Sequence, residues 1–497
     1  MYKTGFHFRS VLAISVAFCC LLIGQAQDND RTVYHIQAFG SASSGGQTPF
    51  WMVSNREGIV PVDANNGYLR AGIFSHKSLG NHFEWQAGGD IVFVAPRYKN
   101  VYIHQLYTAL SYRNIHLSIG SRSGYKYHLS TVDPSLSSGD MGMSTNARPI
   151  PEVNLFLPEY VTIPWTKGWL QGRGHFAIGR SFDTDYLSQF NKTDQFYVQN
   201  VLWHHKSLYA RIKDTQNGFP VSMVIGLRHI AQWGGVSTNP KLGNQPHSIK
   251  DLLRIMLGKS GGDNASLSDQ INALGAHTGT YDIRMGYEKQ DWAVFAYYQD
   301  IFSDASGMEL YNLWDGLKGI QLNLNKMPWL SKIVLEYMTT LNQSGPFHFI
   351  DFDHDKYPGY GGGADNYYNN GEYTTGTSYF NRSLGSPLLI SPAYNTDGAP
   401  GFKHTRVRAW HTGIEGQIIH DLSYRLLVTH MESFGTPFAP TIEKLKNTSF
   451  TTDFSYHFCN SWKVTASLAA DRGNLLGNHF GCGLSVSRQG SLFGGKR

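Results

Sequence analysis

The sequence predicts an all-β protein, a transmembrane antiparallel up-and-down β-barrel of roughly 16–18 strands with long extracellular loops folded over or into the lumen. Three observations predict this fold. A secretory leader opens the chain, apolar and polar residues alternate over most of its length, and no later stretch is long and apolar enough to cross a bilayer as a helix. We therefore expect the mature protein in the outer membrane.

The leader ends near Ala26, after an apolar run from Val11 to Gly24 and small residues suited to cleavage. This run is too short for a transmembrane helix, which needs roughly 20 residues. A lipoprotein signal fits poorly, because Phe18 stands before Cys19, where cleavage requires a small residue. We expect residues 1–26 to be a signal peptide that is removed.

Composition supports a barrel and gives no sign of a nucleic-acid partner. Without Lys3 and Arg9 of the leader, the formal charge is 42 − 2 − 37 = +3, and the chain has no basic tail. The chain contains 13% aromatic residues, 53 glycines and only 16% charged residues, with a mean hydropathy of −0.30. These values suit aromatic girdles and a strand face that lines a wet lumen.

Individual segments show the two-residue period of half-buried strands. Between Thr280 and Glu288, apolar residues alternate with charged residues and glycine, and the segment from Trp292 to Gln299 follows after a short turn. A turn at Arg113 and Asn114 joins a similar pair. In the last strand the outward set is Phe480, Cys482, Leu484 and Val486.

A soluble β-sandwich also alternates and is the main alternative fold. The alternation continues from Tyr68 to Val486 without separate buried runs, and the connections alternate between very short and very long, which favours an outer-membrane barrel. The two mature cysteines are expected to be unbonded. Cys459 is predicted to face inward and Cys482 outward, two strands apart and beyond the ~7 Å Cα limit for a disulfide.

The predicted organisation has three parts. Residues 1–26 are the signal peptide, residues 27–66 form an N-terminal periplasmic or plug segment, and residues 67–497 form the barrel, with strands beginning near Gly67. Three long insertions are expected, at Ser123 to Thr166, Trp233 to His277 and Ser344 to His404. The stretch from Ile249 to Leu257 is the one plausible helix of the mature chain.

Several long motifs resemble the Wzi family of capsule assembly proteins, in the branch found in Bacteroidota. They are TPFWMVSNREGIVPVDANNGYLRAG at 48–72, NARPIPEVNLFLPEYVTIPWTKGWLQ at 146–171, GLRHIAQWGG at 226–235, DGLKGIQL at 315–322, GGADNYYNNGEY at 362–373 and RVRAWHTGIEG at 406–416. The resemblance covers nearly the whole mature chain. It implies an outer-membrane lectin-like barrel, without catalysis, that holds capsular or exported polysaccharide on the cell surface after a separate channel delivers it.

The chain departs from the family's enterobacterial members, which carry a periplasmic helical bundle, because its N-terminal segment is short and lacks helical periodicity. Its C-terminus also departs from the usual final aromatic residue, since four residues follow Phe493. We expect Phe493 still to serve as the signal for the barrel-insertion machinery. Outer-membrane lipid is the other expected partner besides the polysaccharide.

Polysaccharide recognition needs flat apolar faces for sugar rings and short polar groups for hydroxyls. The segment from Asp351 to Tyr373 has this composition. The candidate platforms are Tyr357, Tyr360, Tyr367, Tyr368 and Tyr373, and the candidate hydroxyl partners are Asp365, Asn366, Asn369, Asn370 and Glu372. The equally weighted alternative is that these residues only fold the loop on itself or plug the lumen.

Other chemistry is weakly indicated. Asp351, Asp353 and Asp355 alternate as oxygen ligands of a cation would, but Lys356 and Gly362 break the EF-hand pattern, so at most an irregular cation site remains. No metal-binding His spacing and no GxSxG nucleophile motif occurs, and we expect no enzyme and no cofactor. A porin-like diffusion channel for small solutes or saccharides is the alternative function.

Overall fold

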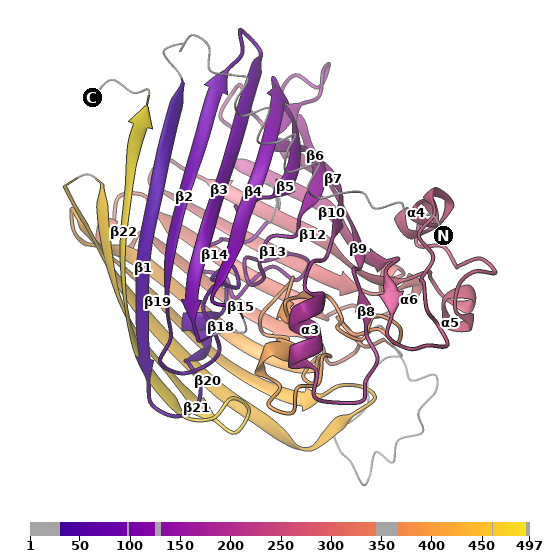
Figure 1. Ribbon diagram of the computed structural model, residues 1–497. Coiled ribbons are helices and arrows are strands. Elements are labelled where there is room, and N and C mark those ends of the chain that lie inside the picture. Colours follow the sequence, from indigo (N-terminus) through magenta and orange to yellow (C-terminus); the bar gives the residue numbers. More distant parts are fainter. Residues whose placement is uncertain (1–29, 97–98, 125–130, 344–364, 460, 494–497) are drawn as a thin grey trace.

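The computed structural model describes residues 30–96, 99–124, 131–343, 365–459 and 461–493. In these residues, eighteen strands form one antiparallel sheet that closes into a barrel (Figure 1). In chain order the barrel strands are β1 (Arg31–Ser43), β2 (Gly67–Ser78), β3 (Phe83–Ala95), β4 (Val101–Tyr112), β5 (Ile115–Ser121), β6 (Glu152–Thr162), β7 (Leu170–Arg180), β9 (Leu202–Lys213), β10 (Val221–Trp233), β12 (Ala276–Glu288), β13 (Trp292–Phe302), β14 (Gly316–Leu324), β15 (Lys332–Thr339), β18 (Val407–Ile419), β19 (Leu422–Gly435), β20 (Pro440–Phe458), β21 (Trp462–Gly473) and β22 (His479–Phe493). The predicted fold class and strand number are confirmed.

The barrel closes where its first strand meets its last. β1 pairs with β22 from Thr32↔Phe493 to Ser43↔Gly481, and with β2 on its other side. The prediction that strands begin near Gly67 is therefore wrong. β1 was missed because Phe39 places an apolar ring on the lumen face, and because the following Gly- and Ser-rich stretch resembles a linker.

The two rims of the barrel differ in their connections. At one end, which we call the short-turn rim, consecutive strands are joined by two to seven residues, as at 113–114 and 420–421. At the other end, the long-loop rim, five connections exceed twenty residues, and the longest spans 340–406. Outer-membrane barrels place short turns in the periplasm and long loops outside the cell, which fixes the orientation of this chain.

The alternation of the strands matches the two environments of the wall. In β12, Met285 is 55% exposed on the outer face, whereas Asp282, which lies on the inner face of the same strand, is fully buried. Leu484 of β22 is likewise exposed outward. No helix of the described residues is long and apolar enough to cross a membrane.

The cysteines are unbonded, as predicted. Cys459, however, does not face the lumen. It lies in the turn after β20, with a positive φ of 50°, and its side chain is exposed. The inward parity expected for it does not apply, because the strand ends at Phe458.

The loops differ from the prediction in two places. The first expected insertion is interrupted by β6, whose alternation is disturbed by Pro158 and whose pairing with β7 shifts between Leu157 and Val161. A further long loop, 181–201, was not predicted. The predicted helix is present as α4 (Ile249–Met256), with a capping box between Ser248 and Asp251.

Short helices and ladders occupy the loops in addition to α4. They are α2 (Phe50–Val53), α3 (Thr184–Phe190), α5 (Leu267–Ile271), α6 (Ala305–Met308), η2 (Pro328–Leu330), η3 (Pro392–Tyr394), the β8 (Val198–Gln199) and β11 (Val236–Ser237) pair, and the β16 (Ser378–Tyr379) and β17 (Arg382–Ser383) pair.

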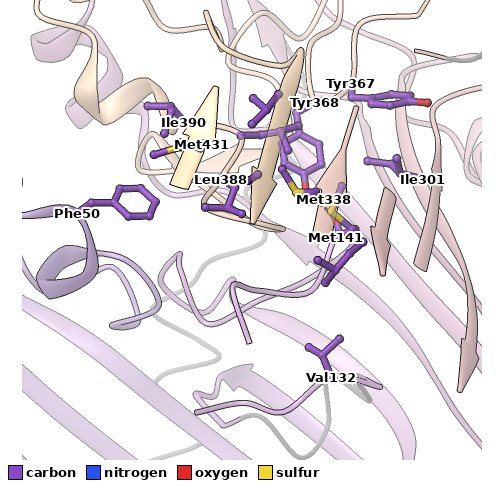
Figure 2. Packing of buried hydrophobic residues seen from close by; sticks show 14 of the residues in the cluster. Phe50, Val132, Met141, Ile301, Met338, Tyr367, Tyr368, Leu388, Ile390 and Met431 are labelled. Carbon is purple, nitrogen blue, oxygen red and sulfur yellow. Dashed lines mark hydrogen bonds between the residues drawn. The ribbon is translucent and has the colours of Figure 1, made fainter. Parts of the chain in front are cut away.

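A plug fills the middle of the lumen, as the sequence predicted for the long loops. We define it as three segments, 48–60, 131–150 and 365–406, which share one hydrophobic cluster with inward side chains of the wall (Figure 2). Phe50, Met141, Tyr368 and Leu388 are at most 2% exposed in this cluster. The segments approach each other so closely at Gly385 that an added Cβ would lie 2.0 Å from the hydroxyl oxygen of Tyr368.

Polar contacts tie the plug to the wall, and most are buried. Asp140 accepts a hydrogen bond from Nη1 of Arg228 at 2.6 Å and another from Nε2 of Gln299 at 2.9 Å. Glu336 accepts from the Ser137 hydroxyl and from the Ser138 amide at 2.6 and 2.7 Å. Such buried polar groups are costly unless paired, so these contacts specify one position of the plug in the lumen.

Candidate functional site

The segment predicted to bind sugars begins at Asp365 in the described residues and lies at the long-loop rim. Tyr357, Tyr360 and the cation candidates Asp351, Asp353 and Asp355 lie outside the described residues. The remaining candidates, 365–373, divide into three buried tyrosines and five polar residues that line a pocket.

The three tyrosines are part of the plug core. Tyr367, Tyr368 and Tyr373 are 0%, 2% and 1% exposed. Tyr367 accepts a hydrogen bond from Nδ2 of Asn312 at 2.9 Å, and Tyr373 donates one to the carbonyl of Gly234 at 3.2 Å. Their predicted role as stacking platforms is corrected, because rings held in this way cannot meet a sugar; they fold the loop, as the alternative prediction stated.

The five polar residues line a pocket of about 1050 Å³ at the long-loop rim, which we call the outer pocket. The outer pocket also receives residues from the loops 181–201, 234–275, 303–315 and 436–439 and from neighbouring strand ends. The structure therefore brings Asp365, Asn366, Asn369, Asn370 and Glu372 together with loops that lie far away in the sequence.

Side-chain amides shape the floor of the outer pocket. Asn369 clamps the backbone of Phe402, donating to its carbonyl and accepting from its amide, both at 2.9 Å. Asn366 accepts from the Thr405 hydroxyl at 2.9 Å, and Asn370 accepts from the amides of Glu372 and Tyr373. None of these bonds uses Nδ2 of Asn366, which is a donor at the pocket surface.

Two exposed rings in the pocket lining were not predicted. Phe196 follows α3 and is 50% exposed, and Phe438 lies in the β19–β20 turn and is 54% exposed. Isolated phenylalanines in loops give no periodic signal, so only the folded structure reveals their common location. They supply the apolar faces that the buried tyrosines do not.

The electrostatics of the outer pocket are dominated by carboxylates. Asp269, Asp304, Asp365 and Glu372 line it, and the ammonium group of Lys403 is paired with Asp397 at 2.5 Å. Burial raises the pKa of Asp269 to about 7, against the opposing hydrogen bond from the Gly275 amide, and the Glu372 charge raises it further. Burial also lowers the pKa of His404 to about 4, so this imidazole is neutral at pH 7.

The raised pKa of Asp269 predicts a pH-dependent stability of the 234–275 loop. The folded pKa lies above the unfolded value of ~3.9, so the stabilisation is fully present below about pH 4 and is lost as pH rises from there to about 7. The variant Asp269→Asn should therefore match the parent protein near pH 3 and melt at a higher temperature at pH 8.

Thermal unfolding at both pH values checks this prediction, with Asp214→Asn as a control of opposite sign. The amides of Asn217 and Gln216 lower the pKa of Asp214 in the β9–β10 turn, so its replacement should cost stability at neutral pH. Equal melting of Asp269→Asn and parent at pH 8 would contradict the assignment.

A second cavity occupies the lumen on the other side of the plug. This inner chamber has a volume of about 1130 Å³, and its lining reaches the short-turn rim at Ser461 and Trp462. Arg56 of the plug and Arg425 of β19 both contact the carboxylate of Asp453 there. The plug lies between the inner chamber and the outer pocket, since it contributes lining residues to both.

A serine, a histidine and a glutamate meet where the plug contacts β4, but not in the arrangement of a hydrolase. Nε2 of His104 lies 3.1 Å from the Ser123 hydroxyl and 3.2 Å from Oε2 of Glu57. A catalytic relay needs the serine and the acid on opposite nitrogens of the ring. The cluster instead links plug and wall, and its hydrogen bonds and the Arg70 charge lower the pKa of Glu57 to about 2 despite burial.

Among the described residues, no three His, Cys, Asp or Glu side chains gather closely enough to hold a metal ion.

Comparison with known proteins places these features in context. A family described as "Capsule assembly protein Wzi" matches residues 52–388, well over half of the chain. None of the curated proteins matches. Among solved structures, Wzi of Escherichia coli, described as an outer membrane protein involved in group 1 capsule assembly and a carbohydrate-binding β-barrel, is 15% identical, with a TM-score of 0.55, and the match covers 97% of this chain and 89% of that one. Pseudomonas aeruginosa OpdQ is 10% identical with a TM-score of 0.48, covering 94% and 100% of the two chains.

Proposed function

We propose, from the premise that this chain belongs to the Wzi family of capsule assembly proteins, that it binds capsular or exported polysaccharide and attaches it to the cell surface. The protein is an outer-membrane β-barrel, and its long-loop rim faces outward. Polysaccharide is accordingly its main partner, and the outer pocket is where we place the contact.

One observation carries this proposal. The barrel holds an outward pocket lined by amides, carboxylates and two exposed phenylalanine rings, directly above a lumen filled by a packed plug. A sugar ring can lie on Phe196 or Phe438 while its hydroxyls bond Asn366 and Glu372. The plug disfavours the alternative of a diffusion channel, which needs an open and charged constriction.

Retention of a polymer does not require tight binding by one pocket. Many barrels that each hold one repeat of the same chain act together, because every further contact forms at a high effective concentration. A pocket with weak affinity for a single repeat therefore suffices to keep a long polysaccharide on the cell.

The proposal includes the branch of the family, the insertion signal and the absence of hydrolase chemistry. The long motifs at 48–72 and 146–171 support a place in the branch of the family found in Bacteroidota. Phe493, the last residue of β22, supports recognition by the barrel-insertion machinery. The geometry of Ser123, His104 and Glu57 supports a binding protein rather than a hydrolase.

Binding of the refolded barrel to surface polysaccharide from its own producing strain tests the function. Single variants Phe196→Ala and Phe438→Ala should each weaken binding by about tenfold, since each loses apolar area buried against the sugar. Asn366→Ala should weaken it by a smaller factor, because it removes one hydrogen-bonding group.

Phe219→Ala provides the matched control. Phe219 is 52% exposed, like the two pocket rings, but lies in the β9–β10 turn at the opposite rim, so its loss should leave binding unchanged. Absence of binding by the parent protein, together with steady single-channel conductance, would overturn the proposal in favour of a channel.

A further inference from the structure

The lipid-facing side of the barrel carries an open apolar furrow beside the closing seam. It crosses β22, β1, β2, β3 and β4 on the outer face and has a volume of about 980 Å³. Ile36 and Ile73 flank it at 52% and 54% exposure. The furrow is on the opposite side of the wall from the inner chamber, and it is independent of the outer pocket.

Two features of the sequence hollow the wall at this place. The outward positions here carry small residues, namely Ala38, Ala71 and Gly89. Elsewhere on the outer face of the barrel such positions carry large apolar residues such as Leu208 and Ile225. The β3–β4 pairing also shifts register between Asp90 and Ile91, and a β-bulge of this kind bends the sheet locally. Missing side chains and a bent wall together leave room for an elongated apolar group.

A single cation lies among the residues that line the furrow, at its short-turn end. Arg488 faces outward on β22, opposite Trp462 in the β21 pairing, and its guanidinium is 5.2 Å from the Trp462 ring centroid and 5.9 Å from that of Tyr34. Asp90 also contributes to the lining, but its carboxylate is bonded to Arg70 and Gln105 on the lumen side. The counter-charge for Arg488 on this face therefore has to come from the membrane, as an anionic group.

We propose that this furrow is a binding site for one phospholipid of the periplasmic leaflet. One acyl chain lies along Ile36, Ala71 and Ile73, and the phosphate of the headgroup meets Arg488 between the two aromatic rings. Guanidinium groups pair well with phosphate, and aromatic residues at this depth are the usual interfacial belt of such barrels.

The charge of the furrow argues against a second copy of the barrel as its occupant. A two-fold dimer brings the same patch of both subunits together, so it would bury two Arg488 side chains in an apolar interface whose lining offers no unpaired carboxylate. A phospholipid instead brings both an apolar chain and the opposite charge.

Native mass spectrometry of the full barrel, released from vesicles of phosphatidylglycerol, tests the site. The parent should retain one phospholipid. Arg488→Gln should reduce the retained fraction about fivefold through loss of one charge contact, and Ala71→Leu should abolish retention by filling the furrow.

The controls are Lys289→Gln and Ala296→Leu. Lys289 stacks on Tyr287 beyond the end of β12, 5.6 Å from the ring centroid, and Ala296 is exposed on β13, so both changes are matched in kind but lie outside the furrow. Equal lipid retention by Arg488→Gln and parent would overturn the phosphate contact. If the parent protein forms dimers and Ala71→Leu disrupts them, the lipid assignment is overturned, and the occupant of the furrow is a second copy of the barrel. Misfolded variants are identified by gel electrophoresis without heating, in which an unfolded barrel migrates more slowly than the folded parent. Arg488→Gln still tests the site if Ala71→Leu fails to fold.

Discussion

Replacement of Asp140 by alanine is expected to lower the free energy of unfolding by about 3–5 kcal/mol. The carboxylate of Asp140 and the guanidinium of Arg228 are 0% and 2% exposed, so the variant would leave a positive charge buried without its main counter-charge. Urea unfolding of the barrel in lipid vesicles, followed by tryptophan fluorescence, measures this change.

The exposed pair of Lys326 and Asp291 provides the control for this prediction. The Lys326 side chain is 71% exposed in the β14–β15 turn and that of Asp291 is 47% exposed in the β12–β13 turn. Asp291→Ala should therefore change stability by at most about 1 kcal/mol. The double variant of Asp140→Leu with Arg228→Met should recover part of the loss, because it also removes the buried cation that Asp140→Ala leaves without its partner. An equal loss in Asp291→Ala and Asp140→Ala would show that burial of the pair is not what stabilises the plug.

Removal of the third plug segment is expected to turn the barrel into a conducting pore. β15 and β18 are neighbours in the sheet, with Thr339 opposite Arg408, so a short Gly- and Ser-rich turn can replace residues 341–406 without disturbing the wall. This change removes Tyr367, Tyr368 and Leu388 from the cluster and opens the centre of the lumen. Planar bilayers should show steady single-channel conductance for the variant and none for the parent.

Excision of a second long loop controls for the effect of shortening as such. Residues 249–271 contain α4 and α5 (Figure 1). Ile255 of α4 packs on Ala231 and Trp233 at the end of β10, in a cluster separate from the plug. Loss of this segment should leave the lumen closed. Conductance in both deletions, or in neither, would contradict the role given to the plug.

The barrel could be predicted from the sequence because its strands obey a local rule. Outward residues such as Met285 and Leu484 must be apolar, and inward residues such as Asp282 must be polar, so the two-residue period survives in the chain itself. β1 escaped prediction where Phe39 broke this rule on the lumen side. Its place in the wall is decided by pairing with β22, which is a long-range contact.

The site could be predicted only in part, because composition does not reveal burial. The tyrosines and the amides of 365–373 have the same polar, aromatic character in sequence, but Tyr367, Tyr368 and Tyr373 fill gaps in the plug while Asn366 and Glu372 face the pocket. Phe196 and Phe438 come from loops more than 200 residues apart, and only closure of the barrel brings both to the same pocket.

The seam between β1 and β22 also limits how the molecule can assemble. Thr32 and Phe493 are 493 − 32 = 461 residues apart, and joining ends at this separation costs about 5 kcal/mol of chain entropy beyond the fixed term. Every strand between them must be in place before the seam offers its ladder of hydrogen bonds in return. Closure of the seam is therefore expected to come late in folding, after the strands between β1 and β22 have paired with one another.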